Sequence, residues 1–581
     1  MLDTATAPPP VPAPGVTAHP GSRRLVLRPP ALGAFFVGFV FWLESLRPTL
    51  LPHPPLSQGV VGALCLLVGY GLGGLAIGLA LRLNRRLGWT GPSSSVRRAA
   101  RWALLVVAVL GVVGGSVVWL AWQNDQRTQV TMPHISWTEV PVMLAVTIVV
   151  AVLVGTLARL VGALVGWFDR VLTRHLPRAL AHLAVGMVVA VVAVGLGNKL
   201  VVDAFLGRVG AAFEAGDTTT EAGAHQPTSS DVSGGPGSLV AWGALGLQGR
   251  NWVSRTSTPA ELQAFAGPGA PVMQPIRAYA GLASAADVDQ RAKLAVEDLA
   301  RAGGFRRKVL VVAGATGSGW VNPVLSSAVE YEWGGDSAMV SMQYSYLPSW
   351  IAFLTDRDTA AAAGDALNRA VYAAWSKLPV DARPLLITFG ESLGSLGTEG
   401  TYLRPTAAGS VAATTSHADG VLWVGPTNSN PVWRQVTAAR TPGSPVWRPT
   451  YADGTRVVFA NSGPELPDAA SGTSRIVYLQ HPSDPVTWWD LPTLWRAPEW
   501  ISQRPLGSDI PSSVGWFPFV TWLQTTGDLM EGFSTPAGHG HNYNGDWARA
   551  VTAVATPAGW TTADTAHLDR AMLALHGLGA N

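Results

Sequence analysis

The feature that most constrains this sequence is a series of five apolar segments within its first 206 residues. They cover roughly residues 31–50, 57–81, 102–122, 140–164 and 180–202. Each is close to the ~20 residues that an α-helix needs to cross a bilayer. Few charged residues lie inside them, which argues against the alternative of buried helices in a water-soluble protein. We therefore expect a transmembrane helical domain over residues 31–206.

The first two segments differ in character. The first is the weakest, because Glu44, Arg47 and Pro48 interrupt its end. The second, residues 57–81, is rich in glycine, which would destabilise a helix in water. In membranes, small residues let neighbouring helices approach closely. The segments are therefore expected to associate as a bundle of about five helices.

The composition agrees with a chain of two parts. Its 581 residues are too many for one ordinary domain. Charged residues make up only 13%, whereas a soluble domain carries roughly 25%. The net charge is +3, and the arginines lie beside apolar segments rather than in one basic stripe. Nucleic acid is therefore not an expected partner.

The arginines between the apolar segments predict the orientation of the helices. They cluster before the first segment, between the second and third, and between the fourth and fifth: Arg23, Arg24, Arg28, Arg82, Arg85, Arg86, Arg97, Arg98, Arg101, Arg170, Arg174 and Arg178. Arginine-rich connections stay in the cytoplasm. The N-terminus is thus expected to be cytoplasmic, and five spans carry the rest of the chain to the extracytoplasmic side. This orientation inverts if the first segment does not span.

Three further regions complete the expected domain organisation. Residues 1–30, rich in Pro, Ala and Gly, are expected to be a disordered cytoplasmic tail rather than a signal peptide. Residues 207–240 are expected to be a flexible linker, and residues 241–581 a catalytic domain. The single cysteine, Cys65, excludes an intramolecular disulfide and a cysteine-based zinc site.

From about residue 241 the sequence alternates between strand and helix patterns. Short, apolar, β-branched runs indicate buried strands, and they cover Lys308–Ala313, Ala338–Tyr344, Leu385–Phe389, Gly420–Val424 and Arg475–Leu479. Helical patterns cover Asp287–Ala302 and Asp358–Leu378. Such alternation predicts a mostly parallel sheet covered by helices.

The strongest motif follows the third of these strands. Leu385–Phe389 runs directly into Gly390-Glu391-Ser392-Leu393-Gly394. In a nucleophile elbow, a strand turns sharply into a helix with the serine at its tip, and small residues two positions before and after let the turn close. The alternative is an ordinary Gly/Ser turn, but the preceding strand favours the elbow. Ser392 is therefore the candidate nucleophile.

An acid and a histidine follow Ser392 in the order that an α/β-hydrolase requires. Asp484 lies just past the strand Arg475–Leu479, and Asp490 is the second choice. Near the C-terminus, Gly538-His539-Gly540-His541 offers two histidines. We prefer His541, which precedes a helical pattern, with His539 as the alternative. A histidine pair can bind metal, but no further His or Cys cluster supports a metal site, and no cofactor is expected.

The glycine-rich loop after Lys308–Ala313 is expected to supply backbone donors for an oxyanion. Its candidates are Thr316, Gly317 and Ser318, and the amide of Leu393 is the second donor. The loop lacks the Gly-Lys-[Ser/Thr] of an ATP-binding loop. Glu391 is expected to stabilise the elbow, with an effect on the histidine as the alternative.

Several stretches carry a resemblance to a known family. They are Ser45-Leu46-Arg47-Pro48-Thr49-Leu50-Leu51-Pro52, Gln248-Gly249-Arg250, Pro275-Ile276-Arg277, Thr316-Gly317-Ser318-Gly319-Trp320-Val321-Asn322-Pro323, the elbow and Gly538-His539-Gly540-His541. With them the sequence resembles the actinobacterial membrane-anchored α/β-hydrolase family, over nearly the whole chain after residue 30. The resemblance implies an N-terminal multi-helix membrane domain, a C-terminal hydrolase domain, and a serine esterase or lipase of the cell envelope.

Three functions are compatible with these features. The first is a membrane-anchored serine esterase or lipase acting on lipid or lipid-linked esters, with membrane lipids as partners. The second is an acyltransferase that uses the same triad to move an acyl chain to an envelope alcohol. The third is a non-catalytic membrane-binding or scaffold protein. Transport has little support, because Glu44 is the only sign of an intramembrane charge network.

Overall fold

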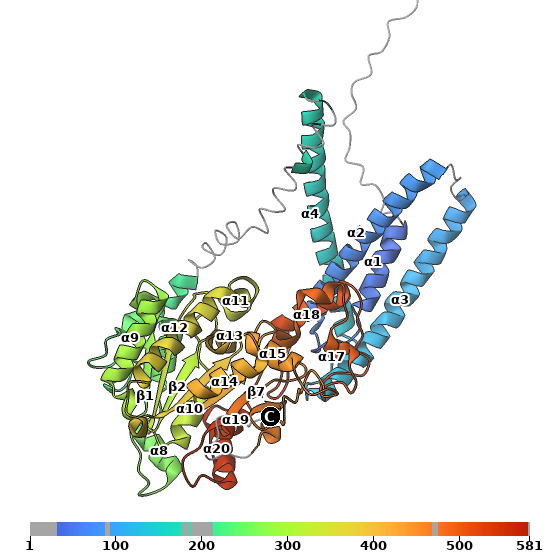
Figure 1. The fold of residues 1–581 in the computed structure, drawn as a ribbon. Coiled ribbons are helices and arrows are strands. Elements are labelled where there is room, and N and C mark those ends of the chain that lie inside the picture. Colours follow the sequence, from blue (N-terminus) through green and yellow to red (C-terminus); the bar gives the residue numbers. More distant parts are fainter. Residues whose placement is uncertain are drawn as a thin grey trace, which may run out of the picture.

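The computed structural model describes residues 32–87, 93–175, 213–467 and 475–578, with a few positions between 177 and 187. Long helices project from one side of a larger domain built on a β-sheet (Figure 1). This division agrees with the two parts expected from the sequence.

The projecting region contains four helices within the described residues. They are α1 (Leu32–Glu44), α2 (Pro55–Leu87), α3 (Ser94–Gln129) and α4 (Glu139–His175). Three of them, α2, α3 and α4, are long and apolar enough to cross a membrane. Many of their large apolar side chains are exposed, as lipid-facing residues would be. The fifth expected segment, residues 180–202, falls mostly outside the described residues.

Helix α1 is shorter than the first expected segment. It has 13 residues and ends at Glu44, whose carboxylate lies 2.7 Å from the Arg47 guanidinium. Pro48 follows and has no backbone N–H with which to continue a helix. The helix packs along α2, and Phe39, Trp42 and Trp119 of α3 share one buried cluster.

The larger domain is built on seven parallel strands in the order β1-β3-β2-β4-β5-β7-β6. In chain order they are β1 (Ile276–Ala280), β2 (Val309–Gly314), β3 (Ser337–Met342), β4 (Leu385–Glu391), β5 (Gly420–Val424), β6 (Val457–Ala460) and β7 (Arg475–Leu479). The five predicted strands are confirmed, and the sequence analysis missed β1 and β6. The parallel sheet is also confirmed.

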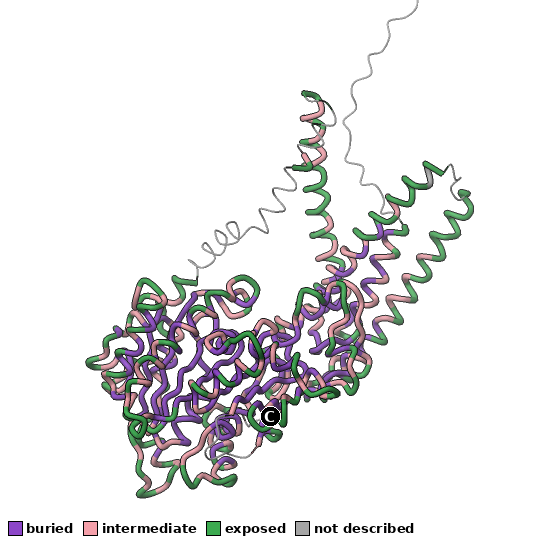
Figure 2. Tube along the Cα trace, in the orientation of Figure 1, coloured by how far each residue is buried: buried purple, intermediate pink, exposed green. Residues whose placement is uncertain are grey.

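Side chains alternate across this sheet into two cores. Along β2, Val309, Val311 and Ala313 face one cluster, whereas Leu310 and Val312 face the other. The first face is covered by α10 (Pro323–Glu332), α19 (Trp547–Val554) and α20 (Thr562–Leu575), and the second by α9 (Val288–Arg301), α12 (Arg357–Trp375) and α13 (Leu393–Glu399). Covering both faces buries the strands, which Figure 2 shows in purple.

Eight further α-helices lie in the described part of this domain. They are α7 (Gly246–Ser254), α8 (Pro259–Ala266), α11 (Ser349–Thr355), α14 (Ala407–His417), α15 (Pro431–Ala438), α16 (Pro485–Trp488), α17 (Glu499–Ser502) and α18 (Val520–Glu531). Of these, α18 lies beside the base of α1 and α2 (Figure 1).

Part of the expected linker packs on the sheet domain. Val232 forms a parallel bridge with Arg277 of β1, and the Ser233 hydroxyl donates to the buried carboxylate of Asp298 on α9 at 2.5 Å. The Asp217 carboxylate accepts from the backbone N–H of Leu247 at 2.9 Å. From Asp217 onward, the described part of this segment is therefore held against the sheet domain.

The membrane helices and the sheet domain meet at residues 45–53, which we call the strap. Leu50 and Leu51 are buried in the same apolar cluster as Trp423 and Tyr478 of the sheet. The Gln524 side chain on α18 donates to the carbonyl of Ser45 at 3.0 Å and to that of Arg47 at 2.7 Å. The chain between α1 and α2 is thus inserted into the sheet domain.

Candidate active site

The topology of the sheet places a crevice at the carboxyl ends of β2 and β4. These strands are neighbours, but the chain leaves β2 towards β3 and leaves β4 towards β5, on opposite sides. In open α/β sheets, ligands bind where strand order reverses in this way. The loop beginning at Thr316 and the turn at Ser392 both lie at this point.

Ser392 has the backbone of a nucleophile elbow. It stands between β4 and α13 with φ 54° and ψ −125°, a strained conformation for a residue other than glycine. A Cβ at Gly390 would lie 2.4 Å from the Gly394 carbonyl oxygen, and one at Gly394 would lie 2.2 Å from the oxygen of Gly314. Only glycine fits at either position, so the motif meets the spatial requirement of a closed elbow.

Neighbouring segments hold the elbow in place. The backbone N–H of Ser392 donates to the carbonyl of Val424, at the end of β5, at 2.9 Å. The Ser395 hydroxyl donates to the Ser392 carbonyl at 2.6 Å. Interactions on both sides of Ser392 therefore offset the strain of its backbone.

Asp484 and His541 form a buried hydrogen-bonded pair. The His541 Nδ1 lies 2.7 Å from Asp484 Oδ2, and both side chains are inaccessible to solvent. Asp484 follows β7, and its other oxygen accepts from the N–H of Val486 at 2.8 Å, at the start of α16. His541 lies in the loop before α19, where its N–H donates to the Gly532 carbonyl at 2.8 Å. The predicted acid and base are thus brought together.

Glycine also makes room for the imidazole. Gly425 directly follows β5 with φ 52°, and a Cβ there would lie 2.5 Å from His541 Cε1. On another side, the ring of Phe533 meets the imidazole edge-to-face, with centroids 4.8 Å apart. These contacts fix the plane of the ring.

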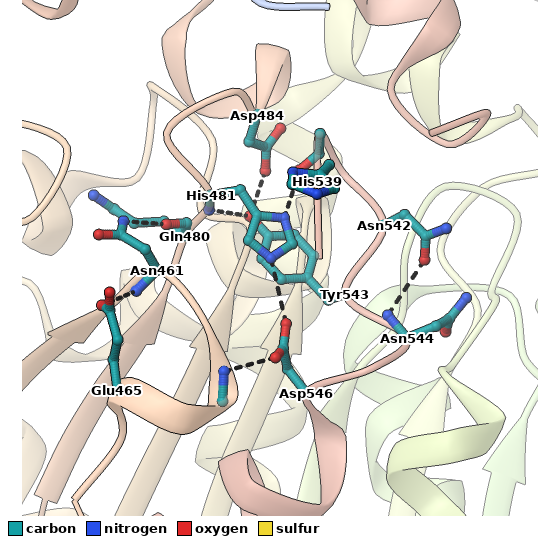
Figure 3. A network of polar contacts seen from close by, with 12 residues as sticks. Asn461, Glu465, Gln480, His481, Asp484, His539, Asn542, Tyr543, Asn544 and Asp546 are labelled. Atoms are coloured by element: carbon teal, nitrogen blue, oxygen red, sulfur yellow. Dashed lines mark hydrogen bonds and ion pairs between the residues drawn. The ribbon is translucent and has the colours of Figure 1, made fainter. Parts of the chain in front are cut away.

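A second buried histidine, His481, lies close to Asp484 and Tyr543 (Figure 3). The Tyr543 hydroxyl donates to Asp484 Oδ2 at 2.7 Å and accepts from the backbone N–H of His481 at 3.1 Å. The rings of His481 and Tyr543 are stacked, with centroids 4.0 Å apart. Burial lowers the pKa of His481, but the hydrogen bond and charge of Asp546, with Asp509 and the Gly540 carbonyl, raise it overall. Tyr543 therefore links Asp484 to this second histidine.

Ser392 and His541 line the same cavity, which has a volume of about 360 Å³. His541 Nε2 is buried and has no hydrogen-bond partner among the described residues. An imidazole held at Nδ1 by a carboxylate keeps its Nε2 available to take a proton from a group in the same cavity.

The alternative residues lie elsewhere. His539 Nδ1 is 3.2 Å from Asp509, a carboxylate that also accepts from the Ser483 hydroxyl. Asp490 is exposed and lines a different cavity, with Trp500. The structure thus pairs His541, rather than His539, with Asp484 beside Ser392.

Glu391 is a buried carboxyl group that lines the same cavity as Ser392. Its Oε2 accepts from the Asn322 amide at 3.0 Å. Burial raises its pKa to about 7, while His541 and the Asn322 hydrogen bond oppose this and Asp484 adds to it. Glu391 therefore holds the elbow to the loop after β2 and also changes charge near neutral pH beside His541.

The four expected oxyanion donors have different surroundings. The Thr316 N–H already donates to the Trp320 carbonyl at 2.9 Å, although Thr316 and Ser318 both line the cavity. Gly317 lies against the backbone of Leu347 and Ser349. Leu393 is the first residue of α13, where a backbone N–H has no acceptor within its own helix. Among these amides, the one at Thr316 is the least able to reach a substrate.

Sequence reasoning did not identify His481, Gly425 or the role of Tyr543. Gly425 directly follows a predicted strand, and Tyr543 lies two residues after His541, so position offered some signal for both. Little in the sequence pointed to His481, because its hydrogen-bond partners come from the loop around Gly540 and from Asp546. Within the described residues, no group of three or more His, Cys, Asp or Glu side chains is arranged to hold a metal ion.

Comparison with known proteins agrees with this fold. Residues 276–568, about half of the chain, match the model of an alpha/beta-hydrolase family, and residues 46–256 match the model of its N-terminal region. No curated protein and no solved structure matches the chain. The sheet, the elbow and the two matches lead to one conclusion: this chain belongs to the alpha/beta-hydrolase family.

Proposed function

We propose that this protein is a membrane-anchored serine hydrolase that cleaves esters through an acyl-enzyme on Ser392. The observation that carries the proposal is the buried Asp484–His541 pair: His541 lines the same cavity as Ser392, and its Nε2 has no hydrogen-bond partner among the described residues. Such an arrangement activates a hydroxyl that is otherwise a poor nucleophile.

In the proposed reaction, Ser392 Oγ attacks the ester carbonyl while His541 Nε2 takes the hydroxyl proton. Asp484 holds the imidazole in its tautomer and stabilises the imidazolium. The alcohol leaves with the proton from His541, and the acyl group stays on Ser392. Water, deprotonated in turn by His541, then attacks the acyl-enzyme, and the carboxylic acid departs as His541 returns the proton to Ser392 Oγ. The Leu393 amide is the donor best placed by position to stabilise the oxyanion.

The proposed location is the cell membrane, with the catalytic domain on the extracytoplasmic side. Its support is the distribution of arginine along the helices. The end of α2, the start of α3 and the end of α4 point away from the sheet domain (Figure 1) and carry Arg82, Arg86, Arg97, Arg98, Arg101, Arg170 and Arg174. Positive residues favour the cytoplasm. We therefore expect lipid or lipid-linked esters of the envelope as substrates.

Labelling with a fluorophosphonate, which reacts with activated serines, tests the catalytic proposal. Full-length protein in membranes should be labelled, and Ser392→Ala should abolish the labelling, while exposed Ser416→Ala on α14 should not. Asp484→Asn should lower the labelling rate by about 10⁴. Asp490→Asn and His539→Gln should retain it. A wild type that fails to react would favour a non-catalytic role.

An acyl-lipid assay separates hydrolysis from acyl transfer. Full-length protein is incubated with a labelled acyl lipid, with and without candidate alcohols. Free acid as the main product supports hydrolysis, whereas transfer product in excess of free acid would assign an acyltransferase with the same triad.

Cysteine labelling tests the orientation, because the one native cysteine, Cys65, is buried. In intact cells, a membrane-impermeant maleimide should label Ser416→Cys directly. Ser95→Cys, at the start of α3, should react only after permeabilisation. The reverse pattern would place the catalytic domain in the cytoplasm.

A further inference from the structure

A second cavity adjoins the catalytic one. It has a volume of about 440 Å³ and lies between α7, the segment around Thr219 and the loop after β2. Gln248 and Trp320 line both cavities, so these two side chains stand at the boundary between them. A substrate bound at Ser392 therefore has a second compartment within reach.

The outer wall of this second cavity is fixed in place. The Arg250 guanidinium on α7 donates to the carbonyl of Asp217 at 2.6 Å and to that of Thr219 at 2.5 Å. A Cβ at Gly249 would lie 2.5 Å from the Tyr279 ring, so α7 lies close against β1. In the motif Gln248-Gly249-Arg250, the first residue thus faces the cavity, the second permits close packing and the third holds the wall.

The chemistry of the lining is polar but close to neutral overall. Glu221 and Arg255 form an exposed ion pair at 3.8 Å, so their charges offset each other. Asn251 Oδ1 is buried and has no hydrogen-bond partner among the described residues. Burying such an acceptor is unfavourable unless a ligand or water satisfies it. Trp320 adds an indole against which a flat, weakly polar face can pack.

We propose that this cavity binds the alcohol half of the ester as a neutral polyhydroxylated group, such as a sugar or polyol. The inference rests on the proposed hydrolase function and adds a substrate class to it. Hydroxyl groups satisfy amide donors and acceptors together, and the carbon face of a sugar ring packs on indole. Gln248 and Asn251 are then specificity-determining residues.

The other classes of ligand fit the lining less well. A phosphate would need several unpaired cations, whereas the described lining offers Arg255, already paired with Glu221. An acyl chain would leave the buried Oδ1 of Asn251 without a donor. A neutral hydroxylated group avoids both penalties.

Binding measurements on full-length Ser392→Ala in nanodiscs test this subsite without turnover. The probes are 6-O-octanoylglucose and ethyl octanoate, which share an acyl chain and differ in the alcohol. The sugar ester should bind more tightly, and adding Asn251→Ala should weaken its binding by about three- to tenfold, as for a lost neutral hydrogen bond. Gln248→Ala is a second variant with the same expectation. Gln290→Ala, an exposed amide on α9, is the matched control and should retain the preference.

The two proposals fail in different ways. Equal affinity for the two esters, or a preference that both Asn251→Ala and Gln248→Ala leave intact, overturns the subsite. Hydrolysis is measured separately with wild-type protein. If neither ester is hydrolysed, the proposed function fails, but the affinities of the Ser392→Ala protein still decide whether the subsite exists.

Discussion

The Asp528 carboxylate on α18 lies 2.8 Å from the His53 imidazole in the strap, and both side chains are almost completely buried. The same carboxylate accepts from the Thr49 hydroxyl at 3.0 Å and from the backbone N–H groups of Leu50 and Leu51 at 3.3 Å. Helix α18 ends one residue before Gly532, whose carbonyl holds the N–H of His541. The strap is therefore connected through α18 to the candidate catalytic histidine.

Removing the Asp528 carboxylate should destabilise the protein and reduce its activity. Asp528→Ala leaves His53 and two backbone donors buried without their acceptor, which costs about 3–5 kcal/mol. We expect the Tm of the full chain in detergent to fall by roughly 4–7 °C. Asp289→Ala, which removes a 72% exposed carboxylate on α9, is the control and should leave Tm unchanged. An unchanged Tm for Asp528→Ala would mean that the strap does not hold the two parts together.

The contribution of His53 to the stability of the folded protein should depend on pH. Burial lowers its pKa, but the hydrogen bond and charge of Asp528, with Glu531 and Gln58, raise it above the ordinary 6.5. A histidine whose pKa is higher in the folded state than in the unfolded state stabilises the folded protein. This stabilisation is complete at pH values below the unfolded-state pKa, and it is lost as the pH rises through the folded-state pKa. The Tm difference between wild type and His53→Gln should therefore be largest near pH 5.5 and shrink towards pH 9. A difference that grows with pH would contradict this assignment.

The elbow should not tolerate a methyl group. In Gly394→Ala, the new Cβ would lie 2.2 Å from the Gly314 oxygen, a backbone atom that cannot turn away. We expect a loss of at least about 3 kcal/mol of stability and no labelling by fluorophosphonate. Gly400→Ala, a few residues along the chain with no atom within 4 Å of its new Cβ, should fold and react normally. Expression level and Tm of the two variants provide the comparison.

The sequence predicted those parts of the site that depend on local patterns. Strand β4 followed by two glycines around Ser392 identifies an elbow, because the steric requirement lies within five residues. The order of Asp484 and His541 along the chain was also informative, since the fold fixes which loops meet at the carboxyl edge of the sheet.

Local sequence patterns could not predict the contacts between segments that lie far apart in the chain. His53 and Asp528 are 475 residues apart, and neither position carries a motif that requires the other. The first apolar segment likewise appeared long enough to span, yet residues 45–53 belong to the interface with the sheet domain. Apolar content gives no information about which domain buries a residue, so Leu50, at the end of that segment, looked like a membrane residue.

Glu391 should limit stability and support catalysis above neutral pH. Its pKa rises to about 7 because burial disfavours the carboxylate. A raised acid pKa means that the folded state binds the proton more tightly than the unfolded state, so stability falls between about pH 4.5 and pH 7. Glu391→Gln removes this penalty, and we expect it to be more stable than wild type by up to about 3 kcal/mol at pH 8 but not at pH 4.5.

The activity of Glu391→Gln should change in the opposite sense. Above pH 7 the wild-type carboxylate favours the imidazolium that forms on His541, and losing about 1 kcal/mol of this interaction lowers kcat roughly fivefold. Near pH 5.5, where Glu391 is protonated, the two proteins should have similar rates. Glu399→Gln is the control, because burial also raises the pKa of Glu399 to about 8. The Glu399 carboxylate accepts hydrogen bonds from the Tyr478 hydroxyl and the Trp433 N–H, and Glu399 does not line the cavity that holds Ser392. Glu399→Gln should keep the wild-type shape of the pH–rate profile. If Glu391→Gln also keeps that shape, the role of Glu391 is confined to holding the elbow.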